Sequence, residues 1–326
     1  MPQIILDVLF YQGMIRFLLK KSLILLVSLW IVVTGTFFLM HAIPGDPFIG
    51  DRVIPEEVMR SLYAHYGLDQ PLWVQYIKYL KGLLHGDLGI SIVYHGRGVA
   101  HFIGEALPVS ALLGFSALCV AIPSGIFLGT IAAIKRNRWQ DTVAMVISTI
   151  GISVPNFVLS SFLQYIFCMK LHLFPVARWE SAAHAVLPTL ALAALPTAFI
   201  ARLTRSNMVE ILQQDYIRTA MAKGLPLFRI AVHHGLRNAI LPVITYLGPV
   251  ATQILTGSFM IERIFAIPGL GQWMIHSIHG RDYPMILGLT VFFSTLLMVA
   301  MFLVDIAYSL LDPRIRIQKK RVAYEG

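Results

Sequence analysis

The sequence predicts an all-α integral membrane protein with six transmembrane helices, and its composition, hydropathy pattern and charge distribution all lead to that prediction. Of the 326 residues, 57% are hydrophobic and only 13% are charged, whereas soluble domains carry about 25% charged residues. A soluble core could not bury so much apolar surface, so we expect a lipid bilayer around the chain. The net charge of +9 comes from residues between the apolar runs, which favours a membrane over a nucleic-acid partner.

The first predicted span is Ser22–Met40, which carries no charge and can cross about 30 Å of hydrocarbon as a helix. Arg16, Lys20 and Lys21 precede it, as basic residues also precede the apolar part of a signal peptide. The apolar run is too long for a signal peptide, and no small-residue cleavage site follows it. We therefore expect an uncleaved first span.

Further apolar runs bring the predicted number of spans to six. The shortest run is interrupted by Pro188 and Pro196, which membrane helices tolerate when neighbouring groups satisfy the freed backbone. The other predicted spans are Pro108–Ile134, Thr142–Met169, Val186–Ile200, Ile240–Ile261 and Pro284–Leu311.

The distribution of Lys and Arg predicts the orientation of the chain. Most of the 26 basic residues lie before the first span, between spans two and three, between spans four and five, or after span six. The positive-inside rule places these segments, and both termini, in the cytoplasm. An even number of spans requires the same arrangement. We therefore expect a multi-pass protein of the bacterial inner membrane, with residues 41–107 on the outer side.

This outer segment is predicted to contain two short helices. Pro55–Tyr66 begins with a proline and two acidic residues and is followed by a glycine, as helices commonly are. Pro71–His85 carries Trp, Tyr and aliphatic residues on one face at helical spacing. Such a helix can lie in the membrane interface or pack against the protein's own spans, and the sequence leaves both interpretations open.

Polar residues inside two of the spans could line a transport pathway. In the third span they recur at intervals of three and four residues, which would place them on one face of a helix. Small polar and amide side chains in membrane helices also hold helices together, and both interpretations stay open. The candidate pathway residues are Ser153, Asn156, Ser160, Gln164, Thr252 and Gln253.

Other residues that can carry chemistry are expected to have structural roles. Asp305 lies inside the sixth span, near its end, where it can accept a hydrogen bond from a neighbour. Cys119 and Cys168 lie in apolar runs and are expected to be reduced core residues. The spacing of His276 and His279 could share a metal ion, but no third ligand is evident, so we expect no metal site.

Sequence motifs of membrane enzymes and of nucleotide-binding proteins are absent from the chain. It contains no H-E-x-x-H zinc motif, no G-x-S-x-G nucleophile elbow and no G-x-x-x-x-G-K-[ST] phosphate loop. We therefore expect no catalytic residue and no bound cofactor. If ATP drives transport, a separate chain hydrolyses it.

The most informative segment is Asp215–Pro242, which is basic, amphipathic and too polar to span a membrane. Gly224 is a typical helix stop and Pro226 a typical helix start, so we expect two short helices joined at a glycine. Physical arguments alone would also allow a solvated connector here.

Part of this segment resembles the EAA loop of binding-protein-dependent ABC importer permeases, in the form typical of their peptide/nickel branch. The run is Tyr216-Ile217-Arg218-Thr219-Ala220-Met221-Ala222-Lys223-Gly224, and the family's later leucine falls on Leu236. Arg218 and Arg237 stand where the general motif has a glutamate and a proline. The resemblance implies that the loop, residues 204–240, docks into an ATPase. The docking residues that it implies are Tyr216, Arg218, Thr219, Ala220, Lys223, Gly224 and Leu236.

Further signatures of the same branch follow in order over nearly the whole chain. They are His41–Pro47, Tyr66–Pro71, Gly86–Gly89, Ile267–Gly271, Arg281–Pro284 and Leu311–Arg314.

The resemblance implies the type I ABC importer permease fold. Residues 1–107 would form the first span and the outer segment, residues 108–311 the permease domain, and residues 312–326 a basic cytoplasmic tail. A second homologous permease, two cytosolic ABC ATPases that use ATP, and an extracytoplasmic substrate-binding protein would complete the importer. Di- or oligopeptides are the expected substrate, with nickel or another small solute as the alternative, and a passive channel or a membrane enzyme fits less well.

Overall fold

The computed structural model describes residues 2–42, 56–94, 96–255 and 259–311. These residues form helices joined by short connections, and the strand-like pairing among them is limited to an isolated bridge between Ile90 and Gly98. The predicted all-α fold class is therefore confirmed.

The chain divides into two compact units. The first combines residues 1–105 with residues 273–326, and the second contains residues 106–272. The domain boundaries expected from the sequence were based on the predicted membrane topology. The two units in the structure are instead groups of residues that contact one another. The last long helix therefore belongs with the N-terminal residues.

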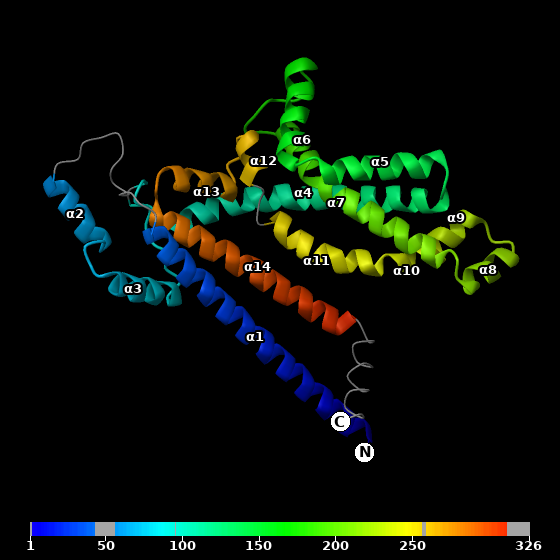
Figure 1. Cartoon of the computed structure of the whole chain (residues 1–326), viewed down its shortest axis with the longest axis horizontal. Helices are drawn as coiled ribbons and strands as arrows, with labels where there is room; N and C mark the ends of the chain where they lie inside the picture. Colours follow the sequence, from blue (N-terminus) through cyan, green and yellow to red (C-terminus); the bar gives the residue numbers. More distant parts are fainter. Residues whose placement is uncertain (1, 43–55, 95, 256–258, 312–326) are drawn as a thin grey trace. The chain divides into compact units, whose positions relative to one another are not determined.

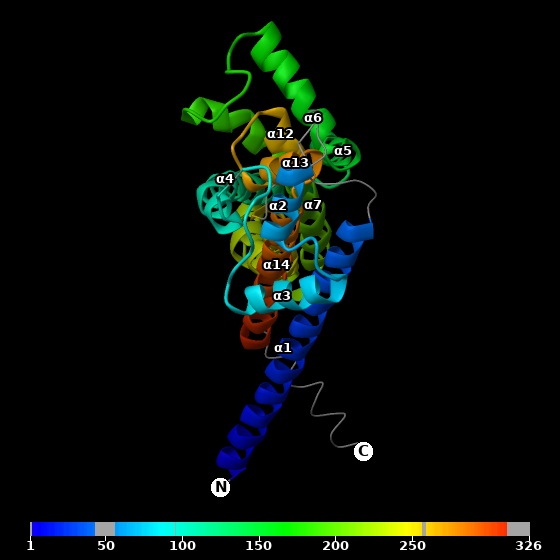
Figure 2. The same cartoon turned by 90° about the vertical axis from the view of Figure 1, so that its left-hand side faces the viewer.

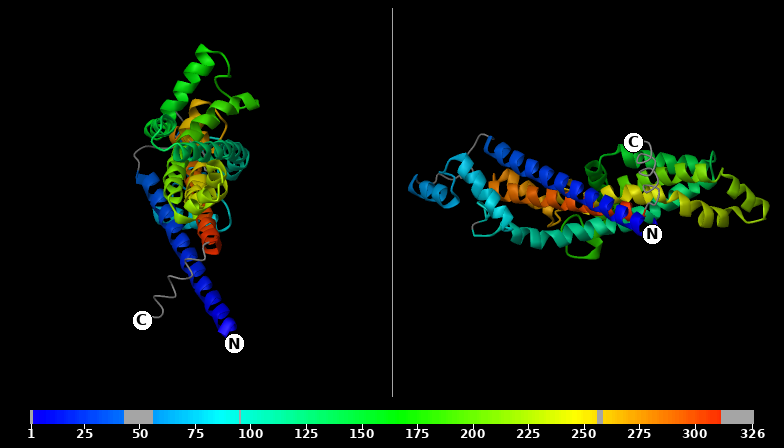
Figure 3. Two further views of the ribbon diagram at one scale, coloured as in Figure 1. Left: turned by 90° about the vertical axis from the view of Figure 1, so that its right-hand side faces the viewer. Right: turned by 90° about the horizontal axis from the view of Figure 1, so that it is seen from below.

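The first unit is built on α1 (Pro2–Ala42) and α14 (Tyr283–Leu311), which lie side by side (Figures 1 and 3). Phe37 of α1 is buried together with Tyr283 and Leu287 of α14. Farther along the two helices, Lys21 Nζ lies 2.6 Å from Asp305 Oδ2. This ion pair confirms the structural role expected of Asp305.

The segment predicted to lie on the outer side contains the two predicted short helices, α2 (Glu56–Tyr66) and α3 (Leu72–Leu84). The segment that follows α3 is tied to α14 by the buried carboxylate of Asp282, at the start of that helix. This carboxylate accepts hydrogen bonds from the Ser91 hydroxyl and, at 3.1 Å, from the Ile92 amide. These hydrogen bonds hold the loop against the start of the helix.

One side of α3 is packed against the protein and another is exposed. Tyr76 packs against Phe37 and shares a hydrogen bond of 2.7 Å with Thr34 of α1. Trp73, Ile77 and Leu84 are exposed. One side of α3 thus packs against the protein, while another leaves apolar side chains free for the membrane interface.

Helix α4 (Val99–Ile134) begins in the first unit and continues into the second. The other helices of the second unit are α5 (Trp139–Ser153), α6 (Asn156–Leu163), the π-helical η1 (Gln164–Lys170), α7 (Ala182–Ile211), α8 (Asp215–Ala222), α9 (Leu227–Ile230), the π-helical η2 (Ala231–Leu236), α10 (Arg237–Ala239), α11 (Leu241–Leu255) and α12 (Phe259–Ile264). The start of α13 (Leu270–His279) completes it. Buried side chains of α4, α7, α11 and α12 form its main core.

Two glycines allow α4 and α7 to approach closely. A Cβ atom on Gly125 would lie 2.7 Å from Ile200 Cβ, and one on Gly129 would lie 2.7 Å from Thr204 Cβ. Both distances are far below van der Waals contact, so any larger residue would push the helices apart. Small residues at such positions are typical of packed membrane helices.

The long apolar helices of the described residues agree with part of the predicted span list. Four are long and apolar enough to cross a membrane, namely Leu19–Ala42, Val99–Ile134, Ala182–Ile211 and Tyr283–Ile306. Leu241–Ala251 is a shorter apolar helix, and the predicted fifth span continues through residues 256–258, outside the described residues. The number of six spans therefore stays a prediction.

The predicted third span is wrong as a single helix. It consists of Trp139–Ser153 and Asn156–Lys170, which are bent by 105° (Figures 1 and 2). Val154 is extended, with φ −86° and ψ 120°. Pro155 causes this because its ring disfavours a helical conformation for the preceding residue and it has no N–H to donate.

The two cysteines are both free thiols, but only one is a core residue. Cys168 is buried, as expected. Cys119 is exposed on α4, so the prediction that it is a core residue is wrong. An apolar run in a membrane protein has a lipid-facing side as well as a buried one, and hydropathy does not distinguish them.

Candidate functional site

The segment after α7 forms a compact knob, defined here as α8 to α10 (residues 215–239). The first helix ends at Ala222, and Gly224 has a φ of 76°, a left-handed conformation that glycine adopts without strain. Pro226 then precedes the start of α9 at Leu227. The predicted pair of short helices joined at a glycine is confirmed.

Buried residues attach the knob to the end of α7. Ile217 and Ile230 are fully buried. Met208 of α7 packs with Ala231 and Ala239, and Leu236 packs against this cluster. The knob is therefore held to α7 by an apolar core instead of being a loose connector.

A hydrogen bond closes the knob on itself. Asn238 Nδ2 donates to the Tyr216 hydroxyl over 3.1 Å, which links α10 to α8. Gly235 leaves room for Met208, because a Cβ atom there would lie 3.1 Å from the Met208 terminal methyl. These contacts give the knob a defined shape.

The outer surface of the knob combines apolar and basic side chains. Tyr216, Met221 and Phe228 are exposed, and Phe228 is the most exposed of them, at 73%. Arg218 and Lys223 lie exposed on the same segment. Exposed aromatic residues beside cations are characteristic of surfaces that bind another protein.

The predicted docking residues fall into two groups. Tyr216, Arg218, Thr219, Lys223 and Gly224 are exposed, whereas Ala220 and Leu236 are half-buried. Leu236 packs toward α7, so its contribution is to anchor the knob.

An ion pair that the sequence analysis missed joins α5 to α7. The Arg205 guanidinium donates to both Asp141 oxygens, at 2.6 and 2.7 Å. Asp141 also accepts the Asn137 amide at 3.0 Å. The sequence signal that could have revealed this pair is Asp141, a lone acid at the start of an apolar run.

The candidate pathway residues of the third span do not share one face, so that expectation is wrong. Ser153 ends α5, while Asn156 begins α6 beyond the 105° bend. The buried Ser160 hydroxyl donates to the Asn156 carbonyl over 2.8 Å. Gln164 donates to the carbonyls of Val176 and Ile264, at 2.7 and 3.3 Å.

The burial of Ser160 and the hydrogen bonds of Gln164 to carbonyls outside its own helix favour the packing interpretation for both residues. The side chains of Thr252 and Gln253 lie outside the described part of the structure.

A second missed feature is a buried carboxylate next to the signature Ile267–Gly271. Glu262 of α12 is fully buried and accepts the Ser110 hydroxyl at 2.8 Å and the Gly271 amide at 2.7 Å. The Ser110 oxygen in turn accepts the Leu270 amide at 2.9 Å. A Cβ atom on Gly269 would lie 2.5 Å from Glu262 Cδ, which explains the need for glycine there.

Metal-binding side chains do not cluster in the residues that the structure describes. No group of three or more His, Cys, Asp or Glu residues there could hold a metal ion.

Comparison with known proteins shows similarity over most of the chain. Residues 125–317 match the family described as binding-protein-dependent transport system inner membrane component, and residues 14–104 match its N-terminal family. The chain is 51% identical to the dipeptide transport system permease protein DppB of Bacillus subtilis, covering 94% of this chain and 100% of that protein. It is 41% identical to the oligopeptide transport system permease protein OppB of Escherichia coli, covering 93% and 100%.

A further relative is the dipeptide transport system permease protein DppB of Lactococcus lactis. It is 38% identical, over 93% of this chain and 100% of that protein.

Proposed function

This chain belongs to the family of binding-protein-dependent transport system inner membrane components, and on that premise we propose that it is the permease subunit of a peptide importer. The observation that carries the proposal is its likeness, over nearly its full length, to dipeptide and oligopeptide permeases. The substrate would be a di- or oligopeptide, carried inward across the inner membrane.

The importer would contain further chains. Two cytosolic ATPases would supply the energy, a second homologous permease would form the other half of the pathway, and a substrate-binding protein would deliver peptide from outside. The family description supports the last of these, since it names transport that depends on a binding protein. Both termini and the knob would face the cytoplasm, in line with the distribution of basic residues.

The knob is proposed as the surface that docks into an ATPase. Its exposed Tyr216, Met221 and Phe228 offer an apolar patch, and Arg218 and Lys223 add positive charge. Its Ala231, Leu236 and Ala239 pack with Met208 of α7. Displacement of the knob would therefore move α7 with it.

The ion pair between Arg205 and Asp141 extends this connection to α5. Packed helices joined by buried contacts move as rigid bodies instead of deforming continuously. Closure of the ATPases would thus reach the membrane helices as a rigid-body motion of α5 and α7.

Peptide uptake by the purified complex tests the proposed function. The chain would be reconstituted in proteoliposomes with the partner permease, the ATPases and the binding protein from its own gene cluster. Labelled di- and tetrapeptides should accumulate only with ATP and the binding protein, while labelled nickel should not. Accumulation of nickel without peptide would assign the alternative substrate, and peptide uptake without ATP would indicate a passive channel.

Gly224→Pro tests the docking role of the knob. Proline cannot adopt the positive φ of this position, so the knob should lose its shape, and uptake should be abolished while membrane insertion is unchanged. Co-purification of the ATPases measures docking directly. The matched control is Gly96→Pro, which replaces another glycine of positive φ but lies outside the knob. Normal uptake with normal ATPase recovery in Gly224→Pro would remove the docking role.

A further inference from the structure

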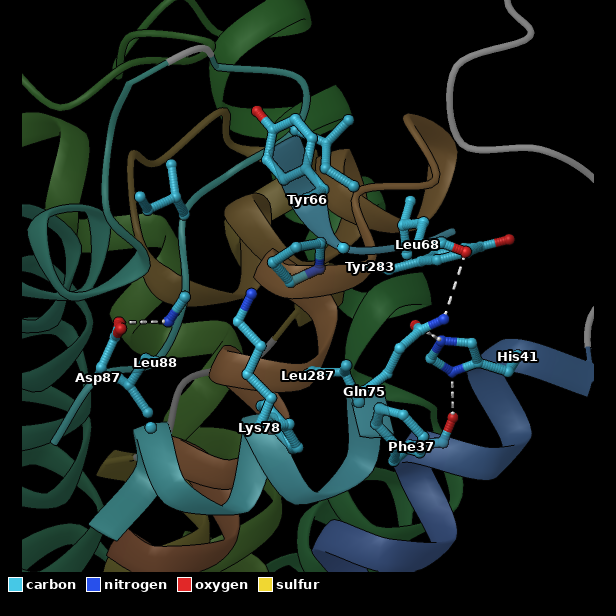
Figure 4. Close-up of a pocket in the computed structure, with 17 residues that line it drawn as sticks. Phe37, His41, Tyr66, Leu68, Gln75, Lys78, Asp87, Leu88, Tyr283 and Leu287 are labelled. Atoms are coloured by element: carbon cyan, nitrogen blue, oxygen red, sulfur yellow. Dashed lines mark hydrogen bonds between the residues drawn. The ribbon is translucent and has the colours of Figure 1, made fainter. Parts of the chain in front are cut away.

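The first unit contains an open cavity of about 280 Å³ between α1, α3, α14 and the segment after α3 (Figure 4). Phe37 and His41 contribute from α1, and Tyr283 from α14. Lys78 and Tyr79 contribute from α3. Every residue that lines this cavity belongs to the first unit.

Most polar groups of the cavity wall already have partners. The His41 ring bonds to the Phe37 carbonyl at 2.8 Å and to Gln75 Oε1 at 3.2 Å. Gln75 also donates to the Gln70 carbonyl at 2.8 Å. The Asp87 carboxylate accepts the Gly89 amide at 2.9 Å and points toward that backbone in Figure 4. These bonds fix the wall before anything binds.

Two donors in the cavity are not used by the described residues. Lys78 rises from α3 with its ammonium pointing into the cavity (Figure 4), and no hydrogen bond or ion pair engages it in the described part of the chain. The Tyr79 hydroxyl is buried and has no hydrogen-bond partner among those residues. Burial also raises the pKa of this hydroxyl, so it stays a donor. An ammonium that points into an open cavity is suited to an acidic oxygen.

The size of the cavity limits what can enter it. Pockets for drug-sized ligands measure about 300–1,000 Å³, so a cavity of about 280 Å³ lies just below that range and has room for a side chain of a partner protein. Its aromatic wall suits an apolar stem with a charged tip.

The position of the cavity on α3 indicates the side from which an occupant comes. Gln75, Lys78 and Gly82 line the cavity, and they share one face of the helix at intervals of three and four residues. The exposed Trp73, Ile77 and Leu84 lie on nearly the opposite face, at 100° per residue. If that apolar face contacts the membrane interface, the cavity faces away from lipid, toward water-soluble partners.

We propose that this cavity is a docking site for an Asp or Glu side chain of the substrate-binding protein, whose carboxylate pairs with Lys78. The proposal rests on the proposed function, because it takes the binding protein as its partner. Residues 14–104, which include most of the cavity wall, match the N-terminal family of binding-protein-dependent components. Pairing of Lys78 with an acidic side chain would steer the binding protein and orient it on the permease.

The test titrates the peptide-loaded binding protein against the reconstituted complex and measures stimulated ATP hydrolysis. Lys78→Glu should raise the KM for the binding protein about tenfold, with kcat unchanged. Lys81→Glu is the matched control, because it makes the same charge change on the same helix at an exposed position outside the cavity.

A charge swap identifies the partner residue. Single Asp→Lys and Glu→Lys variants of the binding protein are screened for one that restores a normal KM with Lys78→Glu but not with Lys81→Glu. Such a restoration supports the proposal and names the contact.

Several outcomes would overturn the inference while the wild-type complex still imports peptide. One is an equal KM for Lys78→Glu and Lys81→Glu. Another is a fall in kcat at unchanged KM for Lys78→Glu. A third is an effect of Lys78→Glu that disappears with C-terminally amidated peptides, since the carboxylate would then belong to the peptide. Absence of any peptide import by the wild-type complex would instead refute the proposed function.

Discussion

The second unit contains two proline-bearing helical stretches of similar length, α5–α6 with η1 and α7, and the prolines act differently in each. Pro155 separates α5 from α6 with a bend of 105°. Pro188 and Pro196 lie inside α7, which continues from Ala182 to Ile211. The same residue type thus breaks one stretch and leaves the other continuous.

The difference follows from the surroundings of the prolines. Pro155 is exposed, and Ser153 beside it is exposed as well. Pro188 and Pro196 are buried in α7, which contacts α5, α6, α10, α11 and α12. Packing on several sides keeps α7 continuous although each proline removes a backbone hydrogen bond. Tertiary contacts therefore decide whether a membrane proline breaks its helix.

The largest expected effect comes from the ion pair that holds α5 on α7. Arg205→Met leaves Asp141, whose side chain is only 6% exposed, as a buried charge without its partner. We expect a loss of about 3 kcal/mol in the free energy of unfolding of the purified complex in detergent. The matched control is Arg202→Met, because Arg202 is exposed and bonds only to Thr149 in the described part of the chain.

Replacing both partners sharpens this test. The double variant Asp141→Leu with Arg205→Met removes both charges and should recover part of the lost stability. A double variant as unstable as Arg205→Met alone would contradict the assigned role of the pair.

A smaller effect is expected where α4 packs against α7. Gly125→Ala places a methyl group 2.7 Å from Ile200 Cβ, and such overpacking costs about 1–3 kcal/mol. Gly35→Ala is the matched control, because nothing lies within 4 Å of a Cβ atom at that helical position. Thermal unfolding of both variants in detergent is the measurement, and equal midpoints would refute the close contact.

The bend itself can be measured by the distance between spin labels at residues 142 and 169. A straight helix would separate them by about 40 Å at 1.5 Å per residue, whereas the bend of 105° reduces this to about 24 Å. Pro155→Ala restores an N–H group and should shift part of the population to longer distances.

Pro196→Ala is the control for this measurement and should leave the distance unchanged, because α7 is already continuous. A wild-type distance near 40 Å would refute the comparison between the two stretches.

The smallest effects concern the hydrogen bonds beyond the bend. Gln164→Leu removes the bonds to the Val176 and Ile264 carbonyls, and we expect a loss of about 1 kcal/mol in unfolding free energy. Peptide uptake per assembled complex should stay unchanged if the residue only packs helices. A fall in uptake without a fall in stability would support pathway lining instead.

The long helices could be predicted because an apolar run of spanning length has few alternatives in a membrane protein. The knob was also predictable, since Gly224 and Pro226 carry local signals for a helix stop and start. The break at Pro155 was not predictable in the same way. Its signal is no different from that of Pro188 or Pro196, and the deciding contacts come from helices far away in the sequence.

The missed polar features have the same cause. Glu262 meets Ser110, and Arg205 meets Asp141, only after helices distant in the chain have packed. Periodicity places a residue on a face of its own helix but does not identify the residue opposite. The prediction that the polar residues of the third span share one face was wrong for a similar reason. It assumed a continuous helix across Pro155.

The pairing of Lys21 with Asp305 has a consequence for biosynthesis. The two residues are 284 positions apart, and they join the first long helix to the last. At about 5–20 residues per second, a ribosome needs on the order of 15–60 s to cover that separation. Residues 106–272, which form the second unit, are all made within this interval. The insertion machinery must therefore hold α1, with the basic side chain of Lys21, in a provisional place until α14 arrives.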